Sequence, residues 1–237
     1  LEQRIANQVF QGLVKLDQAT LKIIPSLAKS WDVNDSATVF TFHIRKGVKF
    51  QDNNCFKDGK GREVTAQDFK YCFDRLCVST PSNQMFWLFK DRVQGITPPK
   101  KHRKAYILII FKTKMTLDKK PLKGGVSGVK VLDKYTIQIK LNYSFAGFLN
   151  IISHSACWVY PKEAVDTYGD DIRVNCVGTG PFRVKKIKES EIVILEKNPT
   201  YWEKDKYGNQ LPYLDGIKVS FIKEKKPELL EFKKGNL

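Results

Sequence analysis

The runs Gly178-Thr179-Gly180-Pro181-Phe182 and Asn198-Pro199-Thr200-Tyr201-Trp202 enclose the segment that decides the fold of this chain. Between them, two short runs rich in β-branched residues flank the polar pair Glu189-Ser190, a pattern that predicts a β-hairpin. Pro181 suits the first residue of a strand, because its missing N–H removes no ladder hydrogen bond there. We call residues 178–202 the signature stretch. Its glycines, proline and aromatic residues indicate structural roles and no catalytic chemistry.

The composition predicts a chain that can bury a large core. It has 237 residues, of which 42% are hydrophobic and 12% aromatic, which fits one large domain or two smaller ones. No run approaches the ~20 apolar residues needed to cross a bilayer, and no signal-peptide pattern stands at the N-terminus. The first ten residues resemble the middle of an amphipathic helix, and the last ones a helix stop. We therefore expect a piece of a longer protein.

The formal net charge is +16, from 41 Lys and Arg against 25 Asp and Glu. Such an excess can mark nucleic-acid or anionic-membrane partners. Here the basic residues are spread over most segments, and the densest cluster lies at 100–104 and 119–120. No recognition helix, RNA-binding aromatic signature or zinc-finger spacing accompanies them. We expect a generally basic, solvated surface and no nucleic-acid partner.

The five cysteines show neither a CxxC pair nor a spacing typical of zinc ligands; they are Cys55, Cys72, Cys77, Cys157 and Cys176. Cys72 and Cys77 stand five apart on a predicted helix, so they project in different directions and should not bridge. We expect them to act as small buried hydrophobes. Pairing among the other three stays open, although an odd count leaves at least one thiol free. No metal site and no cofactor are predicted.

Periodicity indicates an α+β chain. Residues 38–45 alternate, with Phe40, Phe42 and Ile44 on one face of a predicted strand. Residues 65–68 resemble a capping box, and an apolar stripe at helical spacing follows. The runs 126–132 and 135–141 predict a second hairpin. A further strand at 217–222 and a helix at 227–234 are expected near the C-terminus.

The densest aromatic cluster occupies residues 82–89 and includes Phe86 and Trp87. One interpretation is core packing, since burying an aromatic side chain is worth ~2–3 kcal/mol. The other is the rim of a ligand cleft, where Trp suits a surface that is both apolar and hydrogen-bonding. The sequence leaves both open.

Several of these pieces, in order, resemble the bacterial extracellular solute-binding proteins of family 5, the oligopeptide, dipeptide and nickel type. The resemblance rests on ordered motifs spread over almost the whole chain. Residues 10–13 are similar to "F-E-G-L" and residues 25–31 to "P-x-L-A-x-S-W". The remaining motifs are residues 40–50, 64–69, 177–182, 198–202 and 212–215. The chain departs from the family in its longer loop at 52–62.

The resemblance implies a periplasmic-binding-protein-like fold of the class II, three-subdomain type. It assigns residues 1–24 and 174–237 to part of the first lobe and residues 25–173 to a small subdomain inserted in it. The second lobe would be absent from this chain. Because the residues that fix a peptide's termini lie largely in that lobe, only a few contacts can be expected here. By resemblance, these are Asn83, Phe86 and Trp87.

The resemblance also implies a function. It predicts the substrate-binding component of an ABC importer, which binds di- or oligopeptides and delivers them to a membrane permease. Alternatives are nickel, a sugar or another small solute as the ligand, or a role as a ligand sensor. A peptide-processing enzyme is disfavoured, because the chain has no HExxH, no ordered Ser/His/Asp set and no glycine fingerprint after a strand. The expected protein is a monomer, periplasmic or otherwise outside the cytoplasm, with a lipid anchor on a missing N-terminal Cys as one option.

Overall fold

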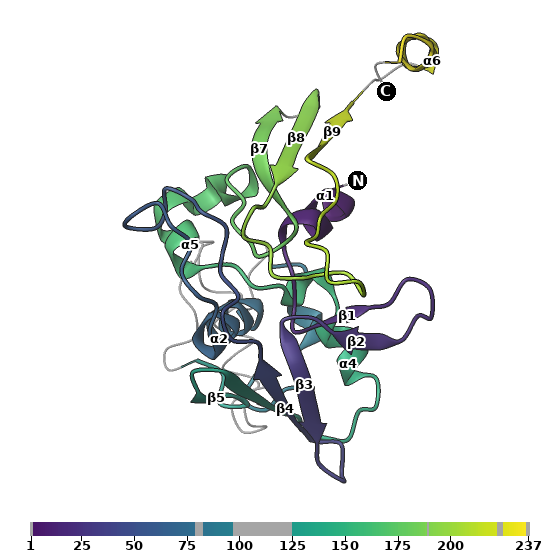
Figure 1. Ribbon diagram of the computed structural model, residues 1–237. Coiled ribbons are helices and arrows are strands. Elements are labelled where there is room, and N and C mark those ends of the chain that lie inside the picture. Colours follow the sequence, from purple (N-terminus) through teal and green to yellow (C-terminus); the bar gives the residue numbers. More distant parts are fainter. Residues whose placement is uncertain (1, 79–82, 97–124, 189, 222–224, 236–237) are drawn as a thin grey trace, which may run out of the picture.

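The computed structural model describes residues 2–78, 83–96, 125–188, 190–221 and 225–235 (Figure 1). The densest cluster of basic residues, at 100–104 and 119–120, lies outside these residues. Among the described residues the strands form three sheets, of two, four and three strands. In Figure 1 the three-stranded sheet lies at the upper end of the molecule and the four-stranded sheet at the lower end.

The four-stranded sheet is antiparallel and has the order β3-β4-β6-β5. Its strands are β3 (Ala28–Val33), β4 (Val39–Ile44), β5 (Val129–Asp133) and β6 (Thr136–Lys140). The alternation predicted for β4 is confirmed, because Phe40, Phe42 and Ile44 are buried. The other face carries His43, whose Nε2 lies 2.7 Å from Asp32 Oδ2 on β3.

Helix α2 (Ala66–Leu76) begins at the predicted capping box. The backbone N–H of Thr65 donates to Oδ2 of Asp68 at 2.8 Å, which provides a partner for a group that the first helical turn leaves unpaired. The predicted apolar stripe is buried and packs against β5 and β6. Its members are Phe69, Cys72, Phe73, Leu76 and Cys77. Local sequence signals therefore define both the start and the inner face of this helix.

The signature stretch forms the predicted hairpin of β7 (Phe182–Lys188) and β8 (Ile192–Lys197). Strand β9 (Gly216–Ser220) pairs with β8 and completes an antiparallel sheet. Helix α1 (Glu2–Val9) packs against β7. Apolar side chains of α1 and of the three-stranded sheet, among them Val9, Phe182 and Leu195, form a small core there.

Most of the hydrophobic core belongs to a second, larger cluster around the four-stranded sheet. It joins the buried face of that sheet to α2 and to the hairpin of β1 (Val14–Leu16) and β2 (Ile23–Pro25). The remaining short elements are η1 (Phe86–Leu88), α4 (Phe148–Ile152), η3 (Ser155–Cys157), α5 (Lys162–Tyr168) and η4 (Gly169–Arg173). Pro161 is the N-cap of α5.

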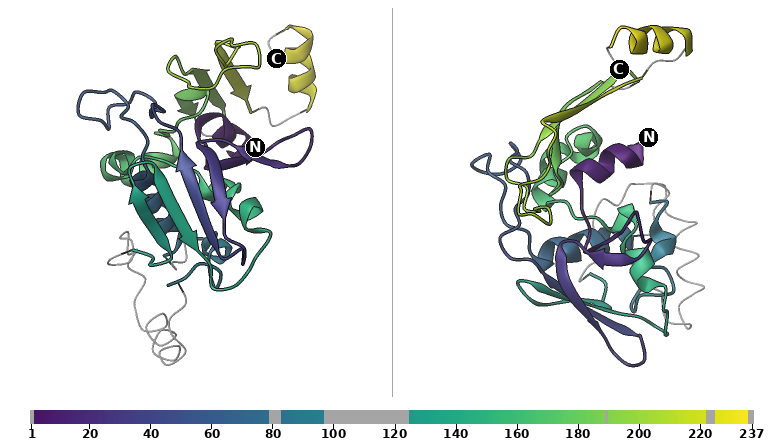
Figure 2. Two further views of the ribbon diagram at one scale, coloured as in Figure 1. Left: turned by 60° about the horizontal axis from the view of Figure 1, so that its bottom comes forward. Right: turned by 45° about the vertical axis from the view of Figure 1, so that its right-hand side comes forward.

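Helix α6 (Lys225–Lys233) stands apart from the body in all the views of Figures 1 and 2. Its side chains Leu229, Leu230 and Phe232 are exposed. All five cysteines are free, and Cys72 and Cys77 are buried as predicted. Burial raises the pKa of the Cys72 thiol to about 12, so this thiol stays protonated at neutral pH.

Candidate ligand-contacting rim and the polar networks around it

The expected contact residues lie on the segment that follows α2, and we call residues 83–89 the rim stretch. Asn83 bonds to the C-terminal end of α2: its Nδ2 donates to the carbonyl oxygens of Leu76 at 2.8 Å and Val78 at 2.7 Å. Its Oδ1 accepts from the backbone N–H of Met85 at 3.2 Å. The amide of Asn83 is therefore committed to holding the rim stretch onto the end of α2.

The other side chains of the rim stretch divide between core and surface. Leu88 and Phe89 are buried, and Phe89 packs on Phe148 with ring centroids 6.2 Å apart. Phe86 is half-buried against the larger core. Trp87 is 54% exposed. Core packing, the first interpretation of the aromatic cluster, describes Phe89, whereas the side chain of Trp87 is available to a ligand.

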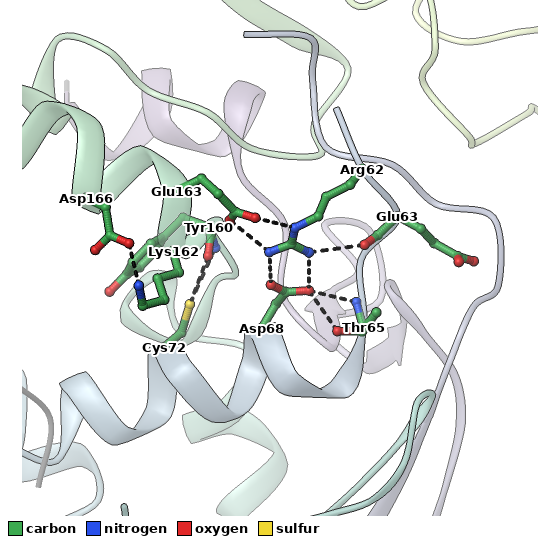
Figure 3. Close-up of polar contacts among 9 residues, drawn as sticks. All are labelled: Arg62, Glu63, Thr65, Asp68, Cys72, Tyr160, Lys162, Glu163 and Asp166. Atoms are coloured by element: carbon green, nitrogen blue, oxygen red, sulfur yellow. Dashed lines mark hydrogen bonds and ion pairs between the residues drawn. The ribbon is translucent and has the colours of Figure 1, made fainter. Parts of the chain in front are cut away.

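A group of charged side chains fixes the loop before α2, and Figure 3 shows its members. Arg62 lies between two carboxylates. Its Nε donates to Glu163 Oε1 at 2.6 Å, and its Nη2 donates to Asp68 Oδ1 at 2.6 Å. We call these three residues the Arg62 cluster. Because Asp68 belongs to α2 and Glu163 to α5, the cluster ties the loop to both helices.

The pKa shifts of Arg62 and Glu163 both favour the charged form. Burial lowers the pKa of Arg62, but hydrogen bonds to the two carboxylates outweigh this effect and raise it overall. The hydrogen bond from Arg62 lowers the pKa of Glu163. An arginine that is hydrogen-bonded to two carboxylates fixes the backbone around it. It has no proton to transfer in a reaction.

A second network surrounds the side chain of Gln11, which is 9% exposed. Its Oε1 accepts from Thr179 Oγ1 at 3.1 Å and from Trp202 Nε1 at 3.0 Å. Its Nε2 donates to Tyr201 Oη at 3.1 Å, and Tyr201 Oη donates to Glu203 Oε2 at 2.6 Å. This Gln11 network connects the chain after α1 to both ends of the signature stretch.

The glycines of the signature stretch permit close backbone approach. A Cβ at Gly178 would lie 2.0 Å from the carbonyl oxygen of Val9, and one at Gly180 would lie 2.4 Å from that of Gln8. The carbonyl of Gly180 also accepts from Asn198 Nδ2 at 2.9 Å. The signature stretch is thus scaffold that packs on the end of α1.

An apolar groove of about 620 Å³ lies between α1 and the three-stranded sheet. Its lining includes Ile5, Val184, Ile187 and Phe221, and no residue of the rim stretch. The groove continues the smaller core and is separate from the rim stretch. In the part of the chain that the structure describes, no cluster of His, Cys, Asp or Glu could hold a metal ion. No helix in that part is long and apolar enough to span a membrane.

Comparison with known proteins agrees with this fold. An oligopeptide-binding protein of an ABC transporter from Borrelia burgdorferi superposes with a TM-score of 0.73 at 25% identity, over 98% of this chain and 41% of that one. The ABC transporter-associated periplasmic binding protein DppA of Helicobacter pylori, in complex with the peptide STSA, gives a TM-score of 0.69 at 24% identity, over 97% of this chain and 40% of that one. The chain therefore has the fold of the periplasmic binding proteins of the OppA and DppA type.

The family follows from sequence comparison. The family described as "Bacterial extracellular solute-binding proteins, family 5 Middle" matches residues 22–237, so the chain belongs to this family. The glutathione-binding protein GsiB of Salmonella choleraesuis is 30% identical over 92% of this chain and 33% of its own length. The periplasmic oligopeptide-binding protein OppA of Escherichia coli K12 is 30% identical over 90% and 35%. This chain thus spans about a third of these relatives.

The comparisons confirm the family and the fold class predicted from the ordered motifs. The family consists of solute-binding proteins and not of enzymes, as expected. Sequence reasoning missed the Arg62 cluster and the Gln11 network. The capping box pointed to Asp68, but no local pattern indicated its partner Arg62 or the more distant Glu163.

Proposed function

We propose that this chain is part of the substrate-binding component of an ABC importer that binds di- or oligopeptides. The observation that supports it most directly is the pair of 30% identical relatives named for glutathione and oligopeptide binding. A cleft suits extended peptides because main-chain hydrogen bonds recognise any sequence, while roomy pockets accept varied side chains. Lobe closure around the solute would complete the site.

We propose that residues 1–24 and 174–237 form part of the first lobe and that residues 25–173 form the inserted subdomain. The two hydrophobic clusters support this division, because the smaller one joins α1 to the three-stranded sheet. The larger cluster also takes in Leu13 and Val177, which lie just outside the proposed subdomain. Those residues would form the joint between the two units.

We propose that the rim stretch contributes Asn83, Phe86 and Trp87 to the ligand cleft. Trp87 is exposed, whereas Asn83 and Phe86 hold the segment against α2 and the core. The partners would be the peptide and the permease subunits in the membrane. The protein would act as a monomer outside the cytoplasm, free in the periplasm or tethered by a lipid.

Native mass spectrometry of the full-length protein, purified without added ligand, tests the function. We expect retained masses that fragment as peptides. Retained nickel or a sugar would replace the peptide assignment with another solute of the same fold. Release of hydrolysed products from a peptide library would contradict a binding role. The 237-residue chain alone is the control, and we expect it to retain little because half of the proposed cleft would be missing.

A further inference from the structure

The chain reverses direction directly after η1, at a turn that is fixed to the four-stranded sheet. Asp91 has a φ of 62°, in the left-handed region that non-glycine residues seldom adopt. Asn142, just beyond β6, secures this turn. Its backbone N–H donates to the carbonyl of Arg92 at 2.7 Å, and its Nδ2 donates to that of Asp91 at 3.0 Å. The backbone of Arg92 is therefore held firmly, and its side chain returns toward η1.

The guanidinium of Arg92 lies between the rim stretch and an aromatic ring. Its Nη1 donates to the carbonyl oxygen of Trp87 at 2.8 Å and to that of Leu88 at 3.4 Å. Its carbon lies 5.5 Å from the centroid of the Phe145 ring, within range of a cation–π contact. Arg92 thus connects η1 to the segment after β6.

This arrangement has local costs for the fold. The Nε of Arg92 is buried, and within the described part of the chain it has no hydrogen-bond acceptor. A buried donor without a partner destabilises the folded state, and a left-handed Asp adds strain. Where two neighbouring residues both oppose stability, a functional constraint is the expected reason.

We propose that Arg92 is a positioning residue that holds the backbone at Trp87, so that the exposed indole is presented to the ligand in a fixed orientation. The proposal rests on the proposed role of the rim stretch. An exposed side chain that is free to move loses conformational entropy when a ligand orders it. By fixing the Trp87 carbonyl, Arg92 restricts the backbone that carries the indole before the ligand arrives. Less conformational entropy is then lost on binding.

The test is a double-mutant cycle in the full-length protein. Arg92→Met keeps the length of the side chain but removes its donors and charge, and Arg92→Lys retains the charge and one donor group. Affinity is measured by calorimetry with trialanine, glutathione and the peptide RPPGFSPFR. We expect Arg92→Met to weaken binding about tenfold, Arg92→Lys to recover part of the loss, and Arg92→Met to add nothing in a Trp87→Ala background. The control is Arg183→Met, which removes an ion pair with Glu196 on the distant sheet and should leave affinity unchanged.

The outcomes separate this inference from the proposed function. Equal losses from Arg92→Met in both backgrounds, or a loss from Trp87→Ala but none from Arg92→Met, would overturn the inference and leave the rim intact. No loss from Trp87→Ala, or no binding of any probe, would count against the proposed function itself.

A second measurement needs no ligand. Fluorine NMR of protein labelled with fluorotryptophan gives one signal per Trp, and that of Trp87 is assigned by its absence in Trp87→Phe. We expect Arg92→Met to shift or broaden this signal while the Trp31 and Trp202 signals stay in place. A Trp87 signal that does not change would overturn the positioning role.

Discussion

The signature stretch and the rim stretch are both rich in aromatic and turn-forming residues, but the fold uses them differently. In the signature stretch, Trp202 and Tyr201 bond to Gln11, and Gly178 packs on the backbone of Val9. In the rim stretch, the aromatic Trp87 is 54% exposed. The residues that identify the family make contacts inside the protein and hold the fold together. The candidate contact residue, Trp87, belongs to a segment with weaker motifs.

The difference follows from where each stretch lies. The signature stretch joins the smaller core to the larger one, so its polar side chains Thr179 and Asn198 are buried and must find partners inside the protein. The rim stretch lies at the end of α2, where only one of its faces meets the core. A surface segment of this kind can change its outward side chains at little cost to stability. Substitutions in the signature stretch should therefore change the free energy of unfolding, and substitutions in the rim stretch should change the affinity for ligand.

The largest expected effect is on stability, from Gly178→Ala. The added methyl group would lie 2.0 Å from the carbonyl oxygen of Val9, so the end of α1 must shift. We expect a loss of about 3 kcal/mol in the free energy of unfolding, measured by urea denaturation. The control is Gly59→Ala, where a Cβ meets nothing within 4 Å and only the positive φ of 67° opposes the change. That variant should lose about 1 kcal/mol, and equal losses from the two variants would contradict the crowding argument.

Gln11→Leu should have the next largest effect. Leu fills much of the space of Gln without its amide, so it leaves Trp202 Nε1 and Thr179 Oγ1 without their acceptor and Tyr201 without its donor. We expect a loss of about 2 kcal/mol, because buried polar groups would lose their partners. Thermal and urea unfolding measure it.

Gln138→Leu is the matched control for Gln11. Gln138 is half-buried on β6, and its side-chain Nε2 donates to Thr41 Oγ1 at 3.2 Å. This variant should lose no more than about 0.5 kcal/mol. If both Leu variants were equally stable, the Gln11 network would not be a joint between the two cores.

Local sequence signals predicted the elements whose partner residues are close in the chain. Thr65 and Asp68 stand three residues apart, and the alternation of β4 is visible within six residues. The networks could not be predicted in this way. Gln11 and Tyr201 are 190 residues apart, and Arg62 and Glu163 are 101 apart. Their meeting depends on how the whole chain folds. For the same reason the sequence could name the rim stretch but not which of its side chains the core would bury.

Trp87→Ala should weaken ligand binding and leave stability nearly unchanged, in contrast to the substitutions that disturb the signature stretch. Because its side chain is 54% exposed, the free energy of unfolding should change by less than about 1 kcal/mol. Affinity of the full-length protein for a peptide should fall about tenfold, as measured by calorimetry. Leu132→Ala on β5, where the side chain is 53% exposed, is the control and should leave affinity unchanged. Unchanged affinity in Trp87→Ala, or loss of the folded state, would remove the contrast between the two stretches.

The smallest effect is expected from Glu163→Gln in the Arg62 cluster, outside both stretches, and it depends on pH. The hydrogen bond from Arg62 keeps the pKa of Glu163 below its usual value of 4.5, so the folded state favours the carboxylate. Its contribution is complete above about pH 4.5 and is lost as the pH falls through the lower, folded-state pKa. Since its side chain is 36% exposed, we expect wild type to exceed Glu163→Gln by less than about 1 kcal/mol at pH 7, and the gap to shrink at pH 3. Glu191→Gln, on an exposed turn, is the control in the same urea titrations. A gap that widens toward acid would show that Arg62 does not stabilise the carboxylate in the folded protein.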